Sequence, residues 1–245
     1  MTGNAFQVAA VWRLRNESVD DLGAGLLKTL DALTTLCPFC EDWEILDHSQ
    51  PRYGPEEMLI ASVPLRQARD RMADFVRYAV SRDDDDQPDP KGGYRLSAGN
   101  NQDNPSKIIE ASCRGAYVNP GMRTSSAGFH TAYSTTPDPT ITAYPVIRSI
   151  LKAYVQIWKP DYAVATTSEL IEHERPLRAI FDGTWMIYLS APLAKRINRT
   201  DKVPIVQVAD GGVYLIAAEE TFDIANPAHR AGAIAIRETV APLNR

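Results

Sequence analysis

The chain has 245 residues, of which 44% are hydrophobic and 23% are charged. Such a composition is typical of a globular protein, and a chain of this length buries a sizeable core. The 26 Lys and Arg residues against 31 Asp and Glu residues give a net charge of −5. Because this charge repels phosphate backbones and attracts basic partners, the sequence disfavours direct nucleic-acid binding.

The apolar runs are too short for a membrane helix, which needs about 18 or more consecutive apolar residues. The longest runs, residues 185–189 and 213–218, have the length of a strand. The apolar segment 6–12 has no basic region before it and is followed by Arg13 and Arg15, which is not the pattern of a secretory signal. Three cysteines fit a reducing compartment. We therefore expect a cytoplasmic protein that does not span a membrane.

The first part of the chain predicts a strand, a helix and a second strand. Residues 6–14 alternate between apolar and other side chains, as in a half-buried strand. Ser18 is placed to cap a helix whose leucines recur at helical spacing as far as residues 37–38. A second strand is expected around Trp43 and Ile45, and residues 51–55 are expected to form a turn.

A second helix is predicted from about Pro64 to the acidic segment at residues 83–86. From there to Pro145 the chain is rich in Gly, Pro, Asn, Ser and Thr, which predicts a meander of short strands joined by long loops. The expected strands of the meander cover residues 94–97, 107–117 and 126–133.

The last part of the chain predicts another alternation of helices and strands. Its apolar periodicity, prolines and glycines place the elements as follows: helices at 146–158, 192–197 and 227–240, strands at 162–166 and 185–189, and a hairpin of 205–209 and 213–218 around Asp210, Gly211 and Gly212. The predicted fold class is α+β, with antiparallel or mixed sheets and packed helices. We expect one domain over residues 1–245, with two related lobes at 1–140 and 141–245.

Cys37-Pro-Phe-Cys40 resembles the active site of glutaredoxins. In those enzymes the first thiol lies at the N-terminus of a helix, where the helix dipole lowers its pKa. Here the pair follows a predicted helix, so Cys37 lies at the negative end of a dipole. We interpret both cysteines as structural. A thiol oxidoreductase that uses Cys37 and Cys40 is the alternative function.

The chain shows no other catalytic or metal-binding motif. A zinc site made of Cys37, Cys40 and His48 lacks a fourth ligand. The remaining histidines are His130, His173 and His229. Glu172, His173 and Glu174 offer acid–base groups, but their position before Pro176 favours a polar turn. We therefore predict no enzyme activity, no metal site and no cofactor.

The acidic segment consists of Asp83, Asp84, Asp85, Asp86 and Asp89. Its spacing lacks the alternation and the glycine of a calcium loop. A solvated acidic loop that faces a basic partner is the functional interpretation. These five residues are the predicted partner-binding residues.

Residues 182–196, with the sequence DGTWMIYLSAPLAKR, resemble the C-terminal part of the immunity protein 52 family. The resemblance implies an α+β antidote of a bacterial polymorphic toxin system, with type VI or contact-dependent delivery of the toxin. It implies that the protein binds a toxin that resembles restriction endonucleases and blocks its active site. Within the matching stretch, Trp185, Tyr188, Leu189 and Ser190 are expected to define the fold. A structural or regulatory module with another partner is the third hypothesis.

Overall fold

The computed structural model describes residues 4–13, 15–37, 39–53, 58–117, 124–133, 135–174 and 181–244. The chain forms two compact units. The N-terminal unit comprises Val11–Asn104 and Ile108–Phe129, and the C-terminal unit comprises Met1–Ala10, Pro105–Lys107 and His130–Arg245. Two strands, β1 (Phe6–Arg13) and β6 (Thr124–Thr131), contribute residues to both units.

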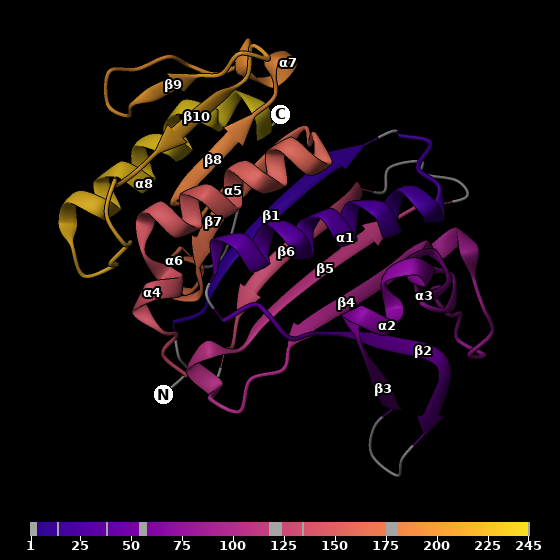
Figure 1. The fold of residues 1–245 in the computed structure, drawn as a ribbon. Helices are drawn as coiled ribbons and strands as arrows, with labels where there is room; N and C mark the ends of the chain where they lie inside the picture. Colours follow the sequence, from indigo (N-terminus) through magenta and orange to yellow (C-terminus); the bar gives the residue numbers. More distant parts are fainter. Residues whose placement is uncertain are drawn as a thin grey trace. The chain divides into compact units, whose positions relative to one another are not determined.

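The N-terminal unit is a sheet covered by helices. Its strands have the order β3-β2-β4-β5-β6, followed by the end of β1, and the pairs β2·β3, β2·β4 and β4·β5 are antiparallel. Figure 1 shows α1 lying along β5, and α1 also packs against α3. The remaining elements are β2 (Trp43–Tyr53), β3 (Met58–Pro64), β4 (Tyr94–Asn100), β5 (Ile109–Gly115), α1 (Val19–Leu36), α2 (Leu65–Ala68), α3 (Met72–Tyr78), and the 3-10 turns η1 (Arg69–Arg71) and η2 (Pro90–Gly92).

Helix α1 is capped at its N-terminus and buries one face of leucines. The Ser18 hydroxyl accepts a hydrogen bond from the backbone N–H of Asp21 at 3.0 Å, and the Asp21 carboxylate accepts one from the N–H of Ser18 at 2.9 Å. This reciprocal cap satisfies two donors that the first turn otherwise leaves unpaired. The four leucines at positions 22, 26, 30 and 33 are fully or almost fully buried. They attach the helix to the unit's core.

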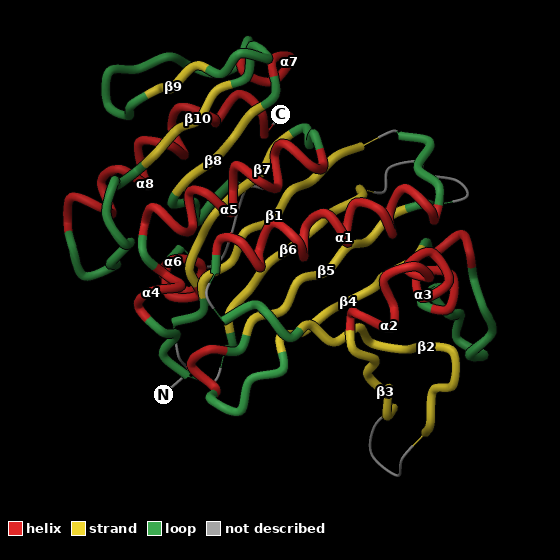
Figure 2. The backbone as a smooth tube through the Cα atoms, viewed as in Figure 1, coloured by secondary structure: helices red, strands yellow, loops and turns green. Residues whose placement is uncertain are grey.

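The C-terminal unit has the strand order β1-β7-β8-β10-β9, and its pairs β7·β8, β8·β10 and β9·β10 are antiparallel. Figure 2 shows these strands in yellow with helices packed beside them. The elements are β7 (Tyr162–Thr167), β8 (Met186–Leu189), β9 (Ile205–Gln207), β10 (Val213–Ile216), α4 (Pro139–Thr142), α5 (Tyr144–Trp158), α6 (Ser168–His173), α7 (Ala191–Ala194), α8 (Pro227–Val240), and the 3-10 turns η3 (Pro105–Lys107) and η4 (Ala241–Asn244).

The two faces of β8 and β10 have different neighbours. Ile187, Leu189, Val213 and Leu215 belong to a buried cluster that includes residues of α8, such as Ile236. Their neighbours along the strands point to the other face because side chains alternate along a strand. That face lies toward α5, and it is the face that carries the candidate site.

The predicted α+β class is confirmed by this architecture. The helices expected at 146–158 and 227–240 and the hairpin around Asp210 are present as α5, α8 and β9–β10. None of the described helices combines the length and the apolar character that crossing a bilayer requires.

Four local predictions were wrong. Residues 51–55 were expected to form a turn, but residues 51–53 belong to β2, which continues to Tyr53 and pairs with the unpredicted β3. Residues 54 and 55 lie outside the described part of the chain. The register shifts between Asp47 and Arg52, and such a bulge tolerates Pro51, which has no N–H to donate. The predicted helix from Pro64 is divided because Arg71, at φ −124° and ψ 20°, leaves the helical conformation between α2 and α3.

The other two errors lie in the C-terminal unit. Glu172 and His173 belong to helix α6 and do not form a turn, because the Thr167 hydroxyl caps this helix by accepting from the N–H of Leu170 at 3.1 Å. The short helix α7 begins at Ala191, which is one residue before the predicted start, and ends at Ala194.

Candidate functional site

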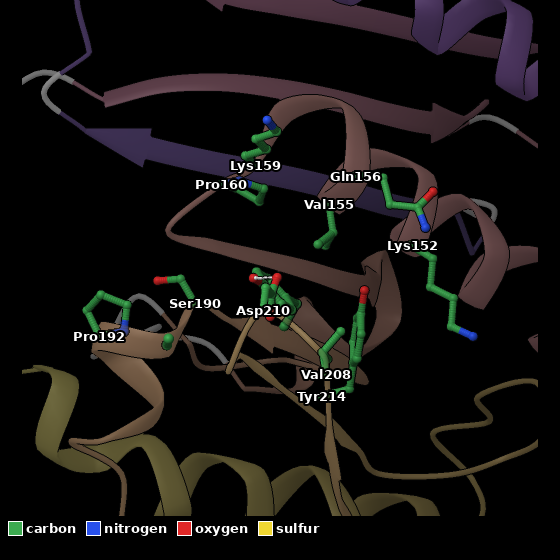
Figure 3. Close-up of a pocket in the computed structure, with 12 residues that line it drawn as sticks. Lys152, Val155, Gln156, Lys159, Pro160, Ser190, Pro192, Val208, Asp210 and Tyr214 are labelled. Atoms are coloured by element: carbon green, nitrogen blue, oxygen red, sulfur yellow. Dashed lines mark hydrogen bonds between the residues drawn. The ribbon is translucent and has the colours of Figure 1, made fainter.

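A pocket of about 680 Å³ opens in the C-terminal unit beside helix α5. Its helix side consists of Lys152, Val155, Gln156 and Lys159, and its opposite side is formed by the β9–β10 hairpin, the end of β8 and the start of α7 (Figure 3). Tyr188 and Tyr214 line the pocket because they lie on the strand face opposite the cluster that packs on α8. The sheet therefore separates a closed core from an open pocket.

The floor of the pocket is organised around Asp210. Its Oδ2 atom accepts a hydrogen bond from the Tyr188 hydroxyl at 2.8 Å, and its Oδ1 atom accepts one from the N–H of Gly212 at 2.7 Å. Tyr188 lies directly opposite Tyr214 in the β8·β10 pair, with 5.2 Å between the ring centroids. These contacts hold the carboxylate and both rings in one arrangement.

Two glycines are required for this arrangement. Gly211 has a φ of +82°, which side chains other than glycine rarely adopt. A Cβ atom on Gly212 would lie 2.7 Å from the Tyr188 ring and 2.8 Å from the carbonyl oxygen of Leu189. The turn can therefore approach β8 only because position 212 has no side chain.

Both phenols of the floor remain protonated at neutral pH. The pKa of Tyr214 is raised to about 12, first by burial and then by the charge of Asp210, while Arg148 acts in the opposite direction. The pKa of Tyr188 is raised by burial and by its hydrogen bond to Asp210. Each phenol can therefore act as a hydrogen-bond donor. The Tyr188 hydroxyl already donates to Asp210, whereas within the described residues the Tyr214 hydroxyl has no partner.

The stretch with family resemblance contributes to the pocket and to the core. Trp185 is fully buried, as expected for an aromatic residue in an apolar segment, and its Nε1–H donates to the carbonyl of Ala218 at 3.0 Å. Leu189 lies in the α8-facing cluster. Tyr188 and Ser190, which sequence reasoning assigned to the fold alone, line the pocket. Sequence reasoning missed the pocket, although the Asp210–Gly212 turn was an available signal.

The acidic segment lies in the N-terminal unit, and its five carboxylates are not equivalent. The Oδ1 atom of Asp83 accepts from the backbone N–H groups of Asp85 and Gln87, at 3.0 and 2.8 Å, and that of Asp89 accepts from Lys91 at 3.0 Å. These two residues therefore shape the loop.

Asp86 lies 3.6 Å from the Arg82 guanidinium. Asp84 and Asp85 are exposed, and within the described residues their carboxylates have no partner. These two residues therefore carry the outward charge of the loop.

A smaller pocket of about 340 Å³ in the same unit is bordered by Glu41, Asp42 and Glu44, together with Arg66. It is a second acidic surface of the N-terminal unit. No predicted site residue lies there.

Cys37 and Cys40 are both fully buried, and no disulfide joins them. Cys37 follows the last residue of α1, and its N–H donates to the carbonyl of Leu33 at 2.8 Å. Its location at the C-terminus of the helix is the one predicted. The adjacent Cys37 thiol and burial together raise the pKa of the Cys40 thiol. The hydrogen bond between the two thiols lowers the pKa of Cys37, but neither buried thiol is accessible to a substrate.

The four histidines belong to four different elements, β2, β6, α6 and α8. His229, in α8, is buried, and its Nδ1 atom accepts from the N–H of Asp223 at 3.0 Å. His48 is half-buried in β2, and burial lowers its pKa. Within the described residues no three His, Cys, Asp or Glu side chains are grouped so that they could hold a metal ion. The pocket and the acidic loop are therefore the two candidate sites.

Comparison with known proteins gives a match over nearly the whole chain. The sequence model of the family described as Immunity protein 52 matches residues 4–243. Among solved structures, the chain is similar to "Pseudomonas aeruginosa T6SS protein PA0821", with a TM-score of 0.55 and 11% sequence identity over 97% of this chain and 73% of that chain. At this identity the similarity concerns the fold alone. No curated protein matches the chain.

Proposed function

Because the chain belongs to the immunity protein 52 family, we propose that it binds a cognate secreted toxin and neutralises it by occluding the toxin's active site. The observation that carries the proposal is the family match, which extends over residues 4–243 and so includes both units. In this role the protein has no catalytic task, and its partner is a protein.

The proposed toxin is a nuclease domain of the restriction-endonuclease type, delivered by a type VI or contact-dependent route. A surface that grips DNA is basic, and a protein with a net charge of −5 is electrostatically complementary to it. An antidote to a toxin that acts on DNA must meet the toxin in the cytoplasm. The similar solved structure is that of a T6SS protein, which agrees with this delivery route.

The proposed first contact is the acidic loop of Asp83, Asp84, Asp85, Asp86 and Asp89. Opposite charges accelerate the encounter of two proteins over distances of about 8 Å, the Debye length at physiological salt. The two outward carboxylates, Asp84 and Asp85, are exposed and can act over this range. Asp83 and Asp89 contribute by holding the loop in its conformation.

The alternative function, a thiol oxidoreductase, is disfavoured by a specific observation. Both thiols are fully buried, whereas a disulfide exchange reaction requires a thiolate that its substrate can reach. The position of Cys37 after α1 also provides no positive dipole end to stabilise a thiolate.

The test uses the toxin encoded next to the gene for this protein. Co-expression should restore growth to cells that produce the toxin, and the purified proteins should form a stable complex in which cleavage of DNA is lost. A catalytically inactive toxin serves as the binding control, because it should form the same complex. A toxin that kills co-expressing cells and elutes separately from this protein would contradict the proposal.

A further inference from the structure

Helix α5 and its C-cap residue carry three cations that form no ion pair with another described residue. Arg148 and Lys152 are four residues apart, which places them about 40° from one another around the helix, and Lys159 is the left-handed C-cap residue that follows Trp158. Lys152 and Lys159 line the pocket and are exposed. Arg148 lies over the ring of Tyr144 at 5.7 Å, and its charge also acts on Tyr214.

Like charges four residues apart on one helix face, such as Arg148 and Lys152, repel each other. A partner that supplies the opposite charge would offset this repulsion. Figure 3 shows that the amino groups of Lys152 and Lys159 are not directed at Asp210, the acidic residue that lines the pocket. Each oxygen of Asp210 already accepts one hydrogen bond, from the Tyr188 hydroxyl and from the N–H of Gly212.

We propose that this pocket is the docking site for an acidic segment of the toxin, whose carboxylates are received by Lys152, Lys159 and the Tyr214 hydroxyl. The inference rests on the proposed function and names a second, separate contact with the same partner. Figure 3 shows the Tyr214 oxygen directed toward α5, on the side where the lysines lie.

The walls of the pocket fit the stem of such a side chain. Val155, Val208 and Pro192 present apolar surface, against which the methylene groups of Asp or Glu can pack. The charged residues that line the pocket are Lys152, Lys159 and Asp210, so the charge balance favours an acidic occupant. The volume of about 680 Å³ exceeds that of one side chain and admits part of a loop.

The experiment measures dissociation of the toxin complex. Reversing both charges, with Lys152→Glu and Lys159→Glu, should accelerate dissociation by about ten-fold or more, because buried or partly buried charge contacts act mainly on the dissociation rate. Tyr214→Phe removes one hydroxyl and should accelerate dissociation by a few-fold. The matched control, Lys28→Glu with Arg199→Glu, changes the net charge equally at exposed positions outside the pocket.

A compensating charge reversal in the toxin tests whether the two lysines contact an acidic residue directly. Exchange of the docking Asp or Glu of the toxin for Lys, found by scanning its acidic residues, should restore slow dissociation with Lys152→Glu and Lys159→Glu but not with the wild type. Thermal unfolding of each variant checks that the fold is retained.

The outcomes separate this inference from the proposed function. If the wild type binds the toxin and the double reversal dissociates at the wild-type rate, or no faster than the matched control, the pocket proposal is wrong and the proposed function stands. If the wild type does not bind the toxin, both are wrong.

Discussion

The two units differ in the charge that they carry and in the surface that they offer. The N-terminal unit has 13 Lys and Arg against 19 Asp and Glu residues, a net charge of −6, whereas the C-terminal unit has 13 against 12, a net charge of +1. The acidic loop belongs to the former and the pocket to the latter. The acidity of the whole chain is therefore a property of one unit.

The two units therefore offer a toxin two kinds of contact, exposed charges in one unit and a pocket in the other. Exposed charges that act through solvent change the rate of encounter, while contacts inside a pocket change the lifetime of the complex. We therefore expect variants of the N-terminal unit to change association and variants of the pocket to change dissociation. The following predictions test that division, beginning with the largest effect.

Trp185→Ala should destabilise the C-terminal unit by about 3–5 kcal/mol, the usual cost of deleting a buried aromatic side chain. The ring of Trp185 is fully buried and lies about 6 Å from the rings of Phe6, Tyr144 and Phe222. The measurement is the midpoint of chemical unfolding. Tyr133→Ala is the control, because that side chain is 50% exposed and should leave the midpoint nearly unchanged. Unchanged stability with lost toxin affinity would instead identify Trp185 as a binding residue.

Gly212→Ala should destabilise the protein by about 1–3 kcal/mol, because an added methyl group overpacks a close contact. The new Cβ would lie 2.7 Å from the Tyr188 ring and 2.9 Å from Asp210 Oδ1. Since those residues form the pocket floor, dissociation of the toxin should also become faster. Gly99→Ala is the control, because the nearest contact of its Cβ is an ordinary 3.9 Å. If Gly212→Ala and Gly99→Ala change the dissociation rate equally, the pocket does not take part in toxin binding.

Neutralising Asp84 and Asp85 together, as Asn, should slow association several-fold and flatten its dependence on salt, with little effect on dissociation. The measurement is stopped-flow or biosensor kinetics at several salt concentrations. Asp103→Asn with Asp201→Asn removes the same charge at exposed positions elsewhere and serves as the control. If both variants associate equally fast, the loop does not face the toxin.

The remaining loop residues sharpen this test. Asn retains an acceptor oxygen at positions 83 and 89, where Oδ1 receives backbone N–H groups, so Asn at all five positions should preserve the loop. Association of the fivefold variant should be only slightly slower than that of the variant at Asp84 and Asp85. If the slowing requires Asp83 and Asp89, their charge contributes to the encounter together with that of Asp84 and Asp85. If the fivefold variant associates as fast as the wild type, the rival acidic groups are Glu41 with Asp42 and Glu219 with Glu220.

The elements that sequence predicted correctly have strong local signals. The capping residues of α1, the proline stop after α5 and the turn of the β9–β10 hairpin lie within a few residues of the structure that they determine. Strand β3 was missed because its place depends on pairing with β2 across a register shift next to a proline. The acidic loop was found as a run of like residues, but the division of labour within it depends on hydrogen bonds that composition does not encode.

The pocket could not be predicted because its residues come from separate parts of the chain. Tyr188 and Asp210 are 22 positions apart, and the cations of α5 precede both. A tyrosine in an apolar strand looks like a core residue, and only the pairing of β8 with β10 shows which face it occupies. Tertiary pairing, which local sequence does not specify, therefore creates this site.

The smallest functional effect is expected for the two cysteines of the N-terminal unit. Cys37→Ala with Cys40→Ala should leave both rate constants of toxin binding unchanged, in reducing and in oxidising buffer. The backbone contacts of this corner, such as the bond from the Thr34 hydroxyl to the carbonyl of Cys40 at 2.8 Å, do not use the thiols. Cys113→Ala is the control, because it deletes a third buried thiol and should cost a similar, modest stability of about 1 kcal/mol per site. A dithiol-dependent reductase activity that is present in the wild type and in Cys113→Ala, but absent from the double variant, would establish the oxidoreductase alternative. It would also give the N-terminal unit a chemical role in place of the purely electrostatic one proposed for its acidic loop.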